Sequence, residues 1–240
     1  MRTAVIGRGP VGRFLASRLG ITPLGRKILP PAEVDVVILA VPDRAIAELA
    51  GHLRRHGDWA LIHCSGASAL SELAPGPAAV WHPMRAFSSI DSVPSTLGGA
   101  VVGLRGDPQL IEWLEGLTKS WGGVPVSIGE DQAVRVHAAC CFAAGFTASV
   151  AADAQALMMA SGVSSDHARQ AIESLSSSAI SQVLKGLGLT GPAIRGDLNT
   201  LEAHLEQLGP LARFYCELSM SMDRHHPLDS MVKECLSSVD

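Results

Sequence analysis

A glycine-rich turn directly behind a short apolar run constrains the fold of this chain more than any other part of its sequence. The apolar run covers residues 3–6, and the turn reads GRGPVG. A buried strand, a GxGxxG turn and then a helix form, in that order, a binding site for a dinucleotide pyrophosphate. The helix N-terminus also offers free N–H groups to the phosphates. We therefore expect cofactor contacts from Gly7, Arg8, Gly9, Pro10, Val11 and Gly12.

The residues that follow this turn bear on which dinucleotide would bind. In NAD-binding domains an acidic residue stands about 20 positions further on and binds the adenine ribose. Here the short apolar segment 21–24 leads instead into Gly25-Arg26-Lys27. A guanidinium suits a 2′-phosphate through paired hydrogen bonds, whereas a carboxylate would repel it. We therefore expect Arg26 and Lys27 to favour NADP over NAD; the alternative is that both are solvated loop charges.

Composition and charge argue against several classes of protein. The chain has 240 residues, enough for two domains that each bury a core. Its net charge of −4 argues against a nucleic-acid partner. The five cysteines show neither a CxxC motif nor a metal-ligand spacing, which predicts free thiols and no metal. No cationic leader precedes the first strand, so we expect a cytoplasmic protein.

Strand and helix patterns alternate through the first half of the chain. Continuous apolar runs end in polar loops, as in parallel strands that are covered on both faces. This alternation predicts a doubly wound, mostly parallel sheet, with ligands bound at the carboxyl ends of the strands. The fold class is therefore α/β, with an NADP-binding Rossmann domain over residues 1–128. The expected strands cover residues 3–6, 21–24 (a stunted strand), 35–43 with its end in a loop, 60–63, 78–81, 100–104 and 124–127.

From residue 129 onward the apolar periodicity is helical. Helices are expected over 130–161, 166–187, 198–208 and 211–223, which make a smaller all-α domain over 129–240. The apolar run 138–152 is rich in alanine and short for a bilayer span, so no membrane partner is expected. Its small side chains would let another helix approach closely. A homodimer formed through this domain is one interpretation, and burial within the same chain is the other.

Polar side chains at the ends of the expected strands are the candidates for chemistry. His82 could protonate a substrate atom, because its ordinary pKa lies near working pH, or it could be structural. Ser65 could orient a substrate, or it could cap the next turn. Asp43 is expected to cap the helix that begins near residue 45 rather than to act as a base. Val41 and Pro42 are expected to line the adenosine pocket.

Three residues of the helical half complete the candidate set. His137 lies on an otherwise apolar stretch of the first long helix, where it could be a second acid, a substrate ligand or a core residue. Arg195 could bind a substrate carboxylate, with Asp197 beside it in the same substrate-binding loop. Alternatively, Arg195 pairs with Asp197 while Asp197 caps the following helix.

Several of these segments also resemble a known family when they are taken together. They resemble the bacterial Rossmann-like proteins that carry a C-terminal domain of unknown function numbered 2520. The resemblance implies a relationship to the superfamily of 6-phosphogluconate dehydrogenase, pyrroline-5-carboxylate reductase and the deazaflavin-dependent NADP oxidoreductases. Members of that superfamily pair a nicotinamide-binding domain with a helical domain that commonly dimerises. The segments are 7–12, 40–43, Ser65-Gly66, 82–87, 137–139 and 191–197.

One departure from that superfamily narrows the expected chemistry. Its hydroxyacid dehydrogenases carry a catalytic lysine on the first long helix, but residues 130–161 contain no lysine, and Arg135 and His137 are the basic residues there. The sequence therefore favours an NADP-dependent oxidoreductase that transfers a hydride to or from a small, anionic carbonyl or imine substrate. The alternative is a non-catalytic NADP(H)-binding sensor or interaction protein with the same fold.

Overall fold

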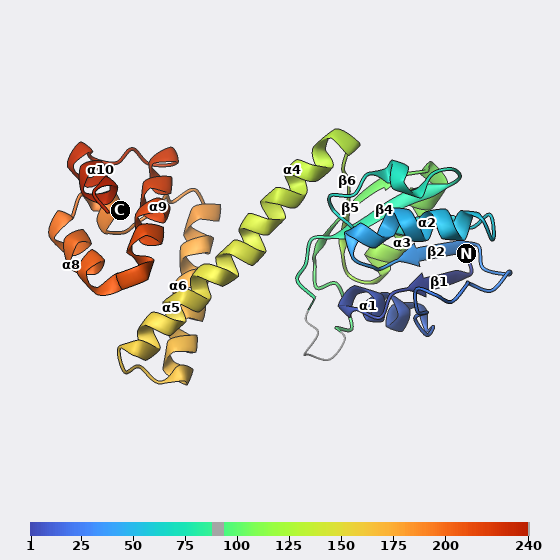
Figure 1. Cartoon of the computed structure of the whole chain (residues 1–240), viewed down its shortest axis with the longest axis horizontal. Coiled ribbons are helices and arrows are strands. Elements are labelled where there is room, and N and C mark those ends of the chain that lie inside the picture. The colour runs from blue at the N-terminus through green and yellow to red at the C-terminus, as the bar shows by residue number, and fades with distance from the viewer. Residues whose placement is uncertain (88–93, 240) are drawn as a thin grey trace. The chain divides into compact units, whose positions relative to one another are not determined.

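Figure 1 shows the computed structural model, which describes residues 1–87 and 94–239. The chain divides into two compact units, Met1–Ala148 and Ser149–Asp240. Residue 128, the end of the expected first domain, directly follows the last strand of the sheet. The first unit continues beyond it because the next helix is bonded to the sheet and to the loop after the third strand through Glu130.

The first unit is built on a six-stranded sheet whose strands follow one another in chain order. The first four strands are parallel, β5 is antiparallel to β4, and β6 is parallel to β5. The segment expected as a stunted strand over 21–24 forms an isolated parallel bridge from Leu24 to Ile6, on the edge of β1 opposite β2. The chain therefore crosses to one side of β1 and then to the other, and the expected doubly wound, mostly parallel sheet is confirmed. The strands are β1 (Thr3–Ile6), β2 (Val36–Leu39), β3 (Ala60–His63), β4 (Ala78–Pro83), β5 (Val101–Gly106) and β6 (Val124–Ser127).

The reversal at β5 was not expected from the sequence. A parallel connection needs a crossover, usually a helix, to return the chain to the starting edge of the sheet. The connection from β4 to β5 contains no helix in its described residues, 84–87 and 94–100. The chain therefore enters β5 near the edge where β4 ends, with Val102 paired to Pro83.

Helices cover both faces of this sheet (Figure 1). On one face α1 (Pro10–Leu19) and α3 (Pro108–Ser120) enclose a core that includes Phe14 and Trp81. On the other face α2 (Ile46–Arg54) packs on β1, β2 and β3, with Leu39 and Leu53 buried between them. The alternating side chains of each strand supply both cores, which explains the continuous apolar runs in the sequence.

A long helical segment follows the sheet. It consists of α4 (Glu130–Cys141), a π-helical turn (Phe142–Phe146) and α5 (Thr147–Ala160), close to the single helix expected over 130–161. By length and composition alone, this segment is long and apolar enough to cross a membrane. Within its most apolar stretch of 18 residues, 6% is buried. Phe142 is 67% exposed.

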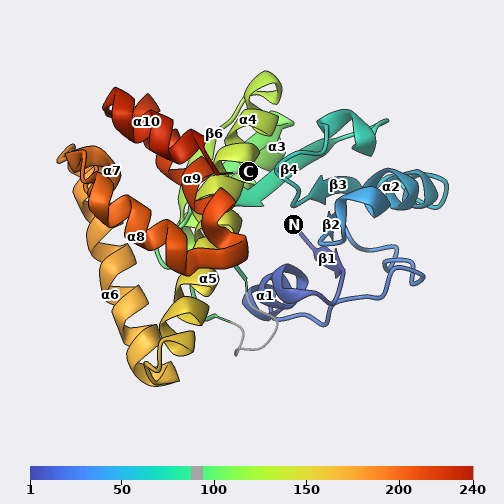
Figure 2. The same cartoon turned by 60° about the vertical axis from the view of Figure 1, so that its left-hand side comes forward.

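The second unit is helical (Figure 2). Its small core joins residues from four helices, among them Leu201 and Val232, which are fully buried. The helix expected over 198–208 forms with those bounds, whereas the short helices α7 and α10 were not expected. The helices are α6 (Ser165–Leu184), α7 (Pro192–Arg195), α8 (Leu198–Leu208), α9 (Ala212–Ser221) and α10 (Ser230–Ser237). Short 3₁₀ turns cover Asp43–Ala45, Leu70–Leu73, Gly209–Leu211 and Met222–Arg224.

Candidate functional site

The three glycines of the turn after β1 differ in whether a side chain would fit: two positions have no room for a Cβ, and one does. Gly7 has φ +128°, and a Cβ there would collide with the carbonyl oxygen of Ala40. A Cβ on Gly12 would collide with the carbonyl oxygen of Gly7. At Gly9, in contrast, a Cβ would meet no atom within 4 Å. Gly7 and Gly12 therefore let β1, β2 and α1 pack together, and Gly9 leaves free space directly before the N-terminus of α1.

This free space belongs to a cavity of about 610 Å³ at the carboxyl ends of β1, β2 and β3. Gly9 is the N-cap of α1 and provides no side-chain hydrogen bond, so the first N–H groups of the helix remain available to an anion. A pyrophosphate fits this arrangement. The predicted residues that line the cavity are Gly7, Arg8, Gly9, Pro10, Val11, Arg26, Val41, Pro42 and Ser65; Asp43 and Cys64 line it as well.

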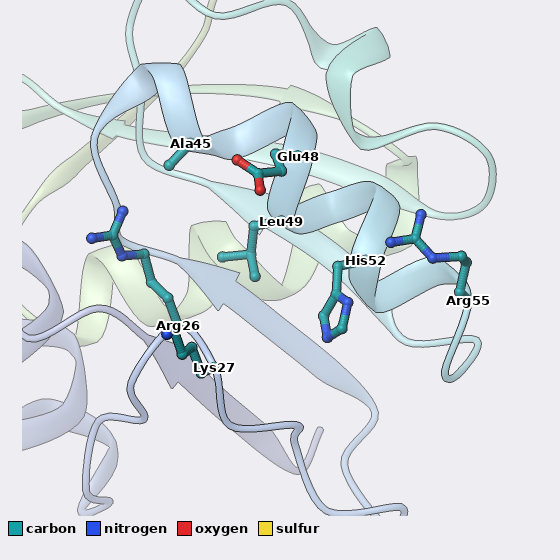
Figure 3. A pocket seen from close by; sticks show the side chains of 7 residues that line it. All are labelled: Arg26, Lys27, Ala45, Glu48, Leu49, His52 and Arg55. Atoms are coloured by element: carbon teal, nitrogen blue, oxygen red, sulfur yellow. The ribbon is translucent and has the colours of Figure 1, made fainter.

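A second cavity, of about 570 Å³, lies between the loop after residue 24 and α2 (Figure 3). Arg26 lines both cavities. Lys27 lies beside it on the loop, while Leu49 and His52 project from α2 toward the loop (Figure 3). Three cationic side chains and one carboxylate, Glu48, surround the buried Leu49, and the cationic side suits a base next to a phosphate. Sequence reasoning missed the contribution of α2, because its periodicity identifies only the core-facing residues.

The turn after β3 is organised by Ser65. Its Oγ accepts hydrogen bonds from the N–H groups of Ala67 at 3.1 Å and Ser68 at 2.9 Å. Its own N–H donates to Nδ1 of His63 at 3.2 Å. Ser65 therefore caps the turn that follows β3, which is one of the two roles that the sequence allows for it. The Ser65 hydroxyl proton still has freedom to donate toward the cavity that the residue lines.

The structure brings His82 and His137 together at Gly66. His82 lies near the end of β4 and His137 two turns into α4, and their ring centroids are 5.5 Å apart. A Cβ on Gly66 would stand 2.5 Å from Nδ1 of His137 and 2.7 Å from Nε2 of His82. Nδ1 of His137 is buried and has no hydrogen-bond partner among the described residues. Two ring nitrogens therefore converge on one point above the glycine.

Burial and nearby charges keep His82 neutral. Burial, then His137 and then the Arg105 guanidinium lower the pKa of His82 to about 4, although Asp43 acts in the opposite direction. His63 lies on the same face of the sheet, and burial followed by Arg105 also lowers its pKa to about 4. Burial raises the pKa of the Cys64 thiol to about 12, which leaves it protonated. His63 and His82 are thus uncharged at neutral pH, where each ring can donate one hydrogen bond and accept another.

The remaining predicted residues lie in other surroundings. Asp197 is the N-cap of α8, where its carboxylate accepts from the N–H of Thr200 at 3.2 Å and from the Thr200 hydroxyl at 2.8 Å. These bonds lower the pKa of Asp197. Arg195 ends α7, is exposed, and forms no ion pair within residues 1–87 and 94–239. The expected cap by Asp43 is wrong, because α2 begins without a side-chain cap and Asp43 belongs to the preceding 3₁₀ turn.

Comparison with known proteins places the chain in a family. The family model described as "Domain of unknown function (DUF2520)" matches residues 100–222, about half of the chain. The chain belongs to the DUF2520 family. The resemblance inferred from the sequence segments is thereby confirmed. A search of curated proteins found no match.

Solved structures share the fold over nearly the whole chain. A Bacteroides fragilis protein that carries an NADP oxidoreductase assignment is 21% identical, with a TM-score of 0.77 over 93% of this chain and 98% of its own. Protein TM1727 from Thermotoga maritima is 22% identical, with a TM-score of 0.74 over 98% and 99%. A Plasmodium falciparum pyrroline carboxylate reductase, solved with NADP bound, is 12% identical, with a TM-score of 0.62 over 99% and 96%. At these identities the likeness establishes the fold.

Proposed function

We propose that this DUF2520 protein is an NADP-dependent oxidoreductase. The observation that carries the proposal is the open position at Gly9, where space for a phosphate faces the uncapped N-terminus of α1. The cavity around it runs from this turn to Ser65. The Plasmodium structure, a pyrroline carboxylate reductase solved with NADP bound, supports the same reaction type.

The adenosine end of the cofactor is assigned to the second cavity, which differs from the expectation for Val41 and Pro42, because both line the first cavity. Arg26 lines both cavities, so a dinucleotide that occupied the two would lie next to this residue. A bidentate contact from Arg26 to a 2′-phosphate, with Lys27 and His52 adding positive potential or hydrogen bonds, would favour NADP. Glu48 lies on the opposite rim and would repel a phosphate placed on that side. The phosphate is therefore expected on the loop side of this cavity.

The chemistry is assigned to the histidine pair. A bound nicotinamide supplies or receives the hydride, and the substrate heteroatom must gain or lose one proton in the same turnover. His82 is neutral at rest, so it can accept the proton of a substrate hydroxyl or amine while the hydride leaves for the cofactor. In the reverse direction the imidazolium so formed returns that proton to the carbonyl oxygen or imine nitrogen. His137 lies beside it, with the ring centroids 5.5 Å apart. Ser65 would orient the substrate from the adjoining turn. Arg195 remains the candidate for binding an anionic substrate, whereas the Asp197 carboxylate caps the adjoining helix α8.

The assembly proposed for this activity is a cytoplasmic homodimer. Phe142, Phe146 and Val150 recur every four residues on the long helical segment and are exposed by 67%, 55% and 37%. Residues at this spacing share one helix face. A second copy of this chain would cover the apolar stripe, which a lone chain leaves in water.

Calorimetric titration with NADPH and NADH tests the cofactor assignment. In Gly9→Val the added side chain starts from a Cβ that meets no protein atom within 4 Å and extends into the phosphate space. Binding should therefore weaken at least about tenfold without loss of stability. Gly116→Val is the matched control, because Gly116 also meets no atom within 4 Å but lies on α3. Absence of NADPH binding to the natural chain, or unchanged binding in Gly9→Val, would contradict the proposal.

A turnover assay distinguishes the proposed oxidoreductase from the alternative, a non-catalytic NADP(H)-binding sensor. Carbonyl compounds and cyclic imines, with and without a carboxylate, are first screened by thermal shift in the presence of NADPH. Ligands that raise Tm are then tested for NADPH oxidation. Turnover that depends on His82 supports the oxidoreductase, whereas tight NADPH binding without any turnover favours the sensor.

A further inference from the structure

A buried arginine outside the proposed reaction connects three parts of the first unit. Arg105 lies in β5 and is 8% exposed. Its Nε donates to Oε2 of Glu130 at 2.6 Å, and its Nη2 donates to the carbonyl oxygen of Ser68 at 2.7 Å. The other carboxylate oxygen of Glu130 accepts from the N–H of Leu70 at 2.8 Å. One guanidinium therefore joins the sheet, the loop over residues 65–70 and the first residue of α4.

The same loop and the same helix carry two parts of the histidine site. Gly66 lies in the loop, two residues before Ser68, and His137 lies seven residues after Glu130 on α4. Seven residues are close to two helical turns, so Glu130 and His137 face the same side of α4. Any sliding of α4 along the loop would move His137 relative to Gly66 and His82.

The strand register places Arg105 on the same face as the histidines. Val80 pairs with His63 on one side and with Arg105 on the other. Residues paired across a sheet share a face, and so do alternate residues of one strand, which adds His82. A buried charge is costly unless its hydrogen bonds are satisfied, so the position of Arg105 under this site requires the partners that it has.

We propose that Arg105 is a positioning residue of the histidine site: through Glu130 and Ser68 it fixes α4 against the loop 65–70 and so holds His137 at Gly66 beside His82. The catalytic meaning of this role rests on the function proposed above. A second consequence is electrostatic. His82 faces His137 on α4, Arg105 on β5 and Asp43 after β2, and the arginine charge lowers its pKa, as does burial.

Histidine NMR on the full chain tests the role without substrate or cofactor. The two rings are close enough for a nuclear Overhauser effect between their carbon-bound protons, given the centroid separation of 5.5 Å. Arg105→Met should weaken this effect and raise the pKa of His82 by roughly half a unit or more, because a nearby positive charge is lost. Arg105→Lys keeps the charge but loses the two-pronged geometry, so it should weaken the effect with a smaller change in pKa.

The matched control is Arg2→Met, which removes an exposed ion pair with Asp35 in the same unit. This variant should change neither the Overhauser effect between the two rings nor the pKa of His82. If Arg105→Met does not fold, Arg105→Lys and Glu130→Gln provide the same comparison, because each keeps a partly bonded network. An unchanged Overhauser effect and titration in a folded Arg105 variant would overturn the proposal. Titration of NADPH into the natural chain reports separately on the proposed function.

Discussion

His82 and His137 meet over a residue that has no side chain, and only a glycine at position 66 leaves room for both rings. The two histidines come from β4 and α4, which lie far apart in the sequence. Their approach therefore depends on the loop after β3 as much as on the elements that carry them.

Gly66→Ala should push the two rings apart. The added Cβ would stand within 2.7 Å of atoms of both imidazoles, so at least one must rotate or α4 must shift. Overpacking of this kind costs roughly 1–3 kcal/mol. Urea unfolding measures the loss of stability, and the Overhauser effect between the rings measures the separation. Gly116→Ala, where the added Cβ meets no atom within 4 Å, should neither lower the stability nor change the separation of the rings.

Arg26→Ala should reduce the preference for NADP over NAD. Arg26 is the cation shared by both cavities, and its loss removes a paired contact to the 2′-phosphate but none to a ribose hydroxyl. The ratio of the two dissociation constants should fall by about tenfold or more in calorimetric titrations. Arg55→Ala, at the far end of the same cavity, is expected to change the ratio less. Equal affinities of the natural chain for the two cofactors would refute the assignment.

The free energy of unfolding should fall as the pH drops from about 6.5 to about 4. His63 has a folded pKa of about 4, lowered first by burial and then by Arg105, whereas Asp43 and Glu130 raise it. Between these values the unfolded chain binds more protons, so acid favours unfolding, and the contribution is complete above the unfolded pKa. The effect is on the order of 3 kcal/mol. Urea melts across this range should show a shallower decline for His63→Asn, whereas the exposed control His226→Asn should follow the natural chain.

Phe142→Asp should dissociate the proposed homodimer. The side chain is 67% exposed on the apolar stripe of the long helical segment, so a charge there opposes burial against a second copy without disturbing this chain's own core. Sedimentation velocity at tens of micromolar should show a dimer for the natural chain and a monomer for the variant. Leu187→Asp, at a position that is 71% exposed and follows α6 in the sequence, serves as control. A monomeric natural chain would exclude the dimer.

Kinetics should separate the roles of His82 and Arg195 once a substrate is known. His82→Ala should lower kcat by roughly 10²- to 10⁴-fold with little change in NADPH affinity, because proton transfer occurs only in the reaction step. Arg195→Ala should mainly raise KM, since a carboxylate contact binds substrate and transition state alike. Natural turnover in His82→Ala would leave that residue with a structural role.

Local patterns predicted much of the fold but little of the contact geometry. The bounds of β6 and α8 follow from short-range periodicity, and both form as expected. The direction of β5 depends on the path of a connection that has no strong pattern. Arg105 was missed because its partners, Ser68 and Glu130, are 37 and 25 residues away along the chain. The two histidines were identified by their chemistry, whereas their convergence at Gly66 is a tertiary contact that the sequence does not encode locally.

The unequal surroundings of the three glycines in the first turn give a way to sort relatives of this protein. Gly7 and Gly12 are required by the packing of the chain against itself, so a descendant that no longer bound any nucleotide would still need both. The packing of the chain does not require a glycine at position 9, so other residues would replace Gly9 by mutation once the ligand no longer bound. Among homologues with this fold, the identity of that single middle residue should therefore separate those that still bind a dinucleotide from those that have become scaffolds.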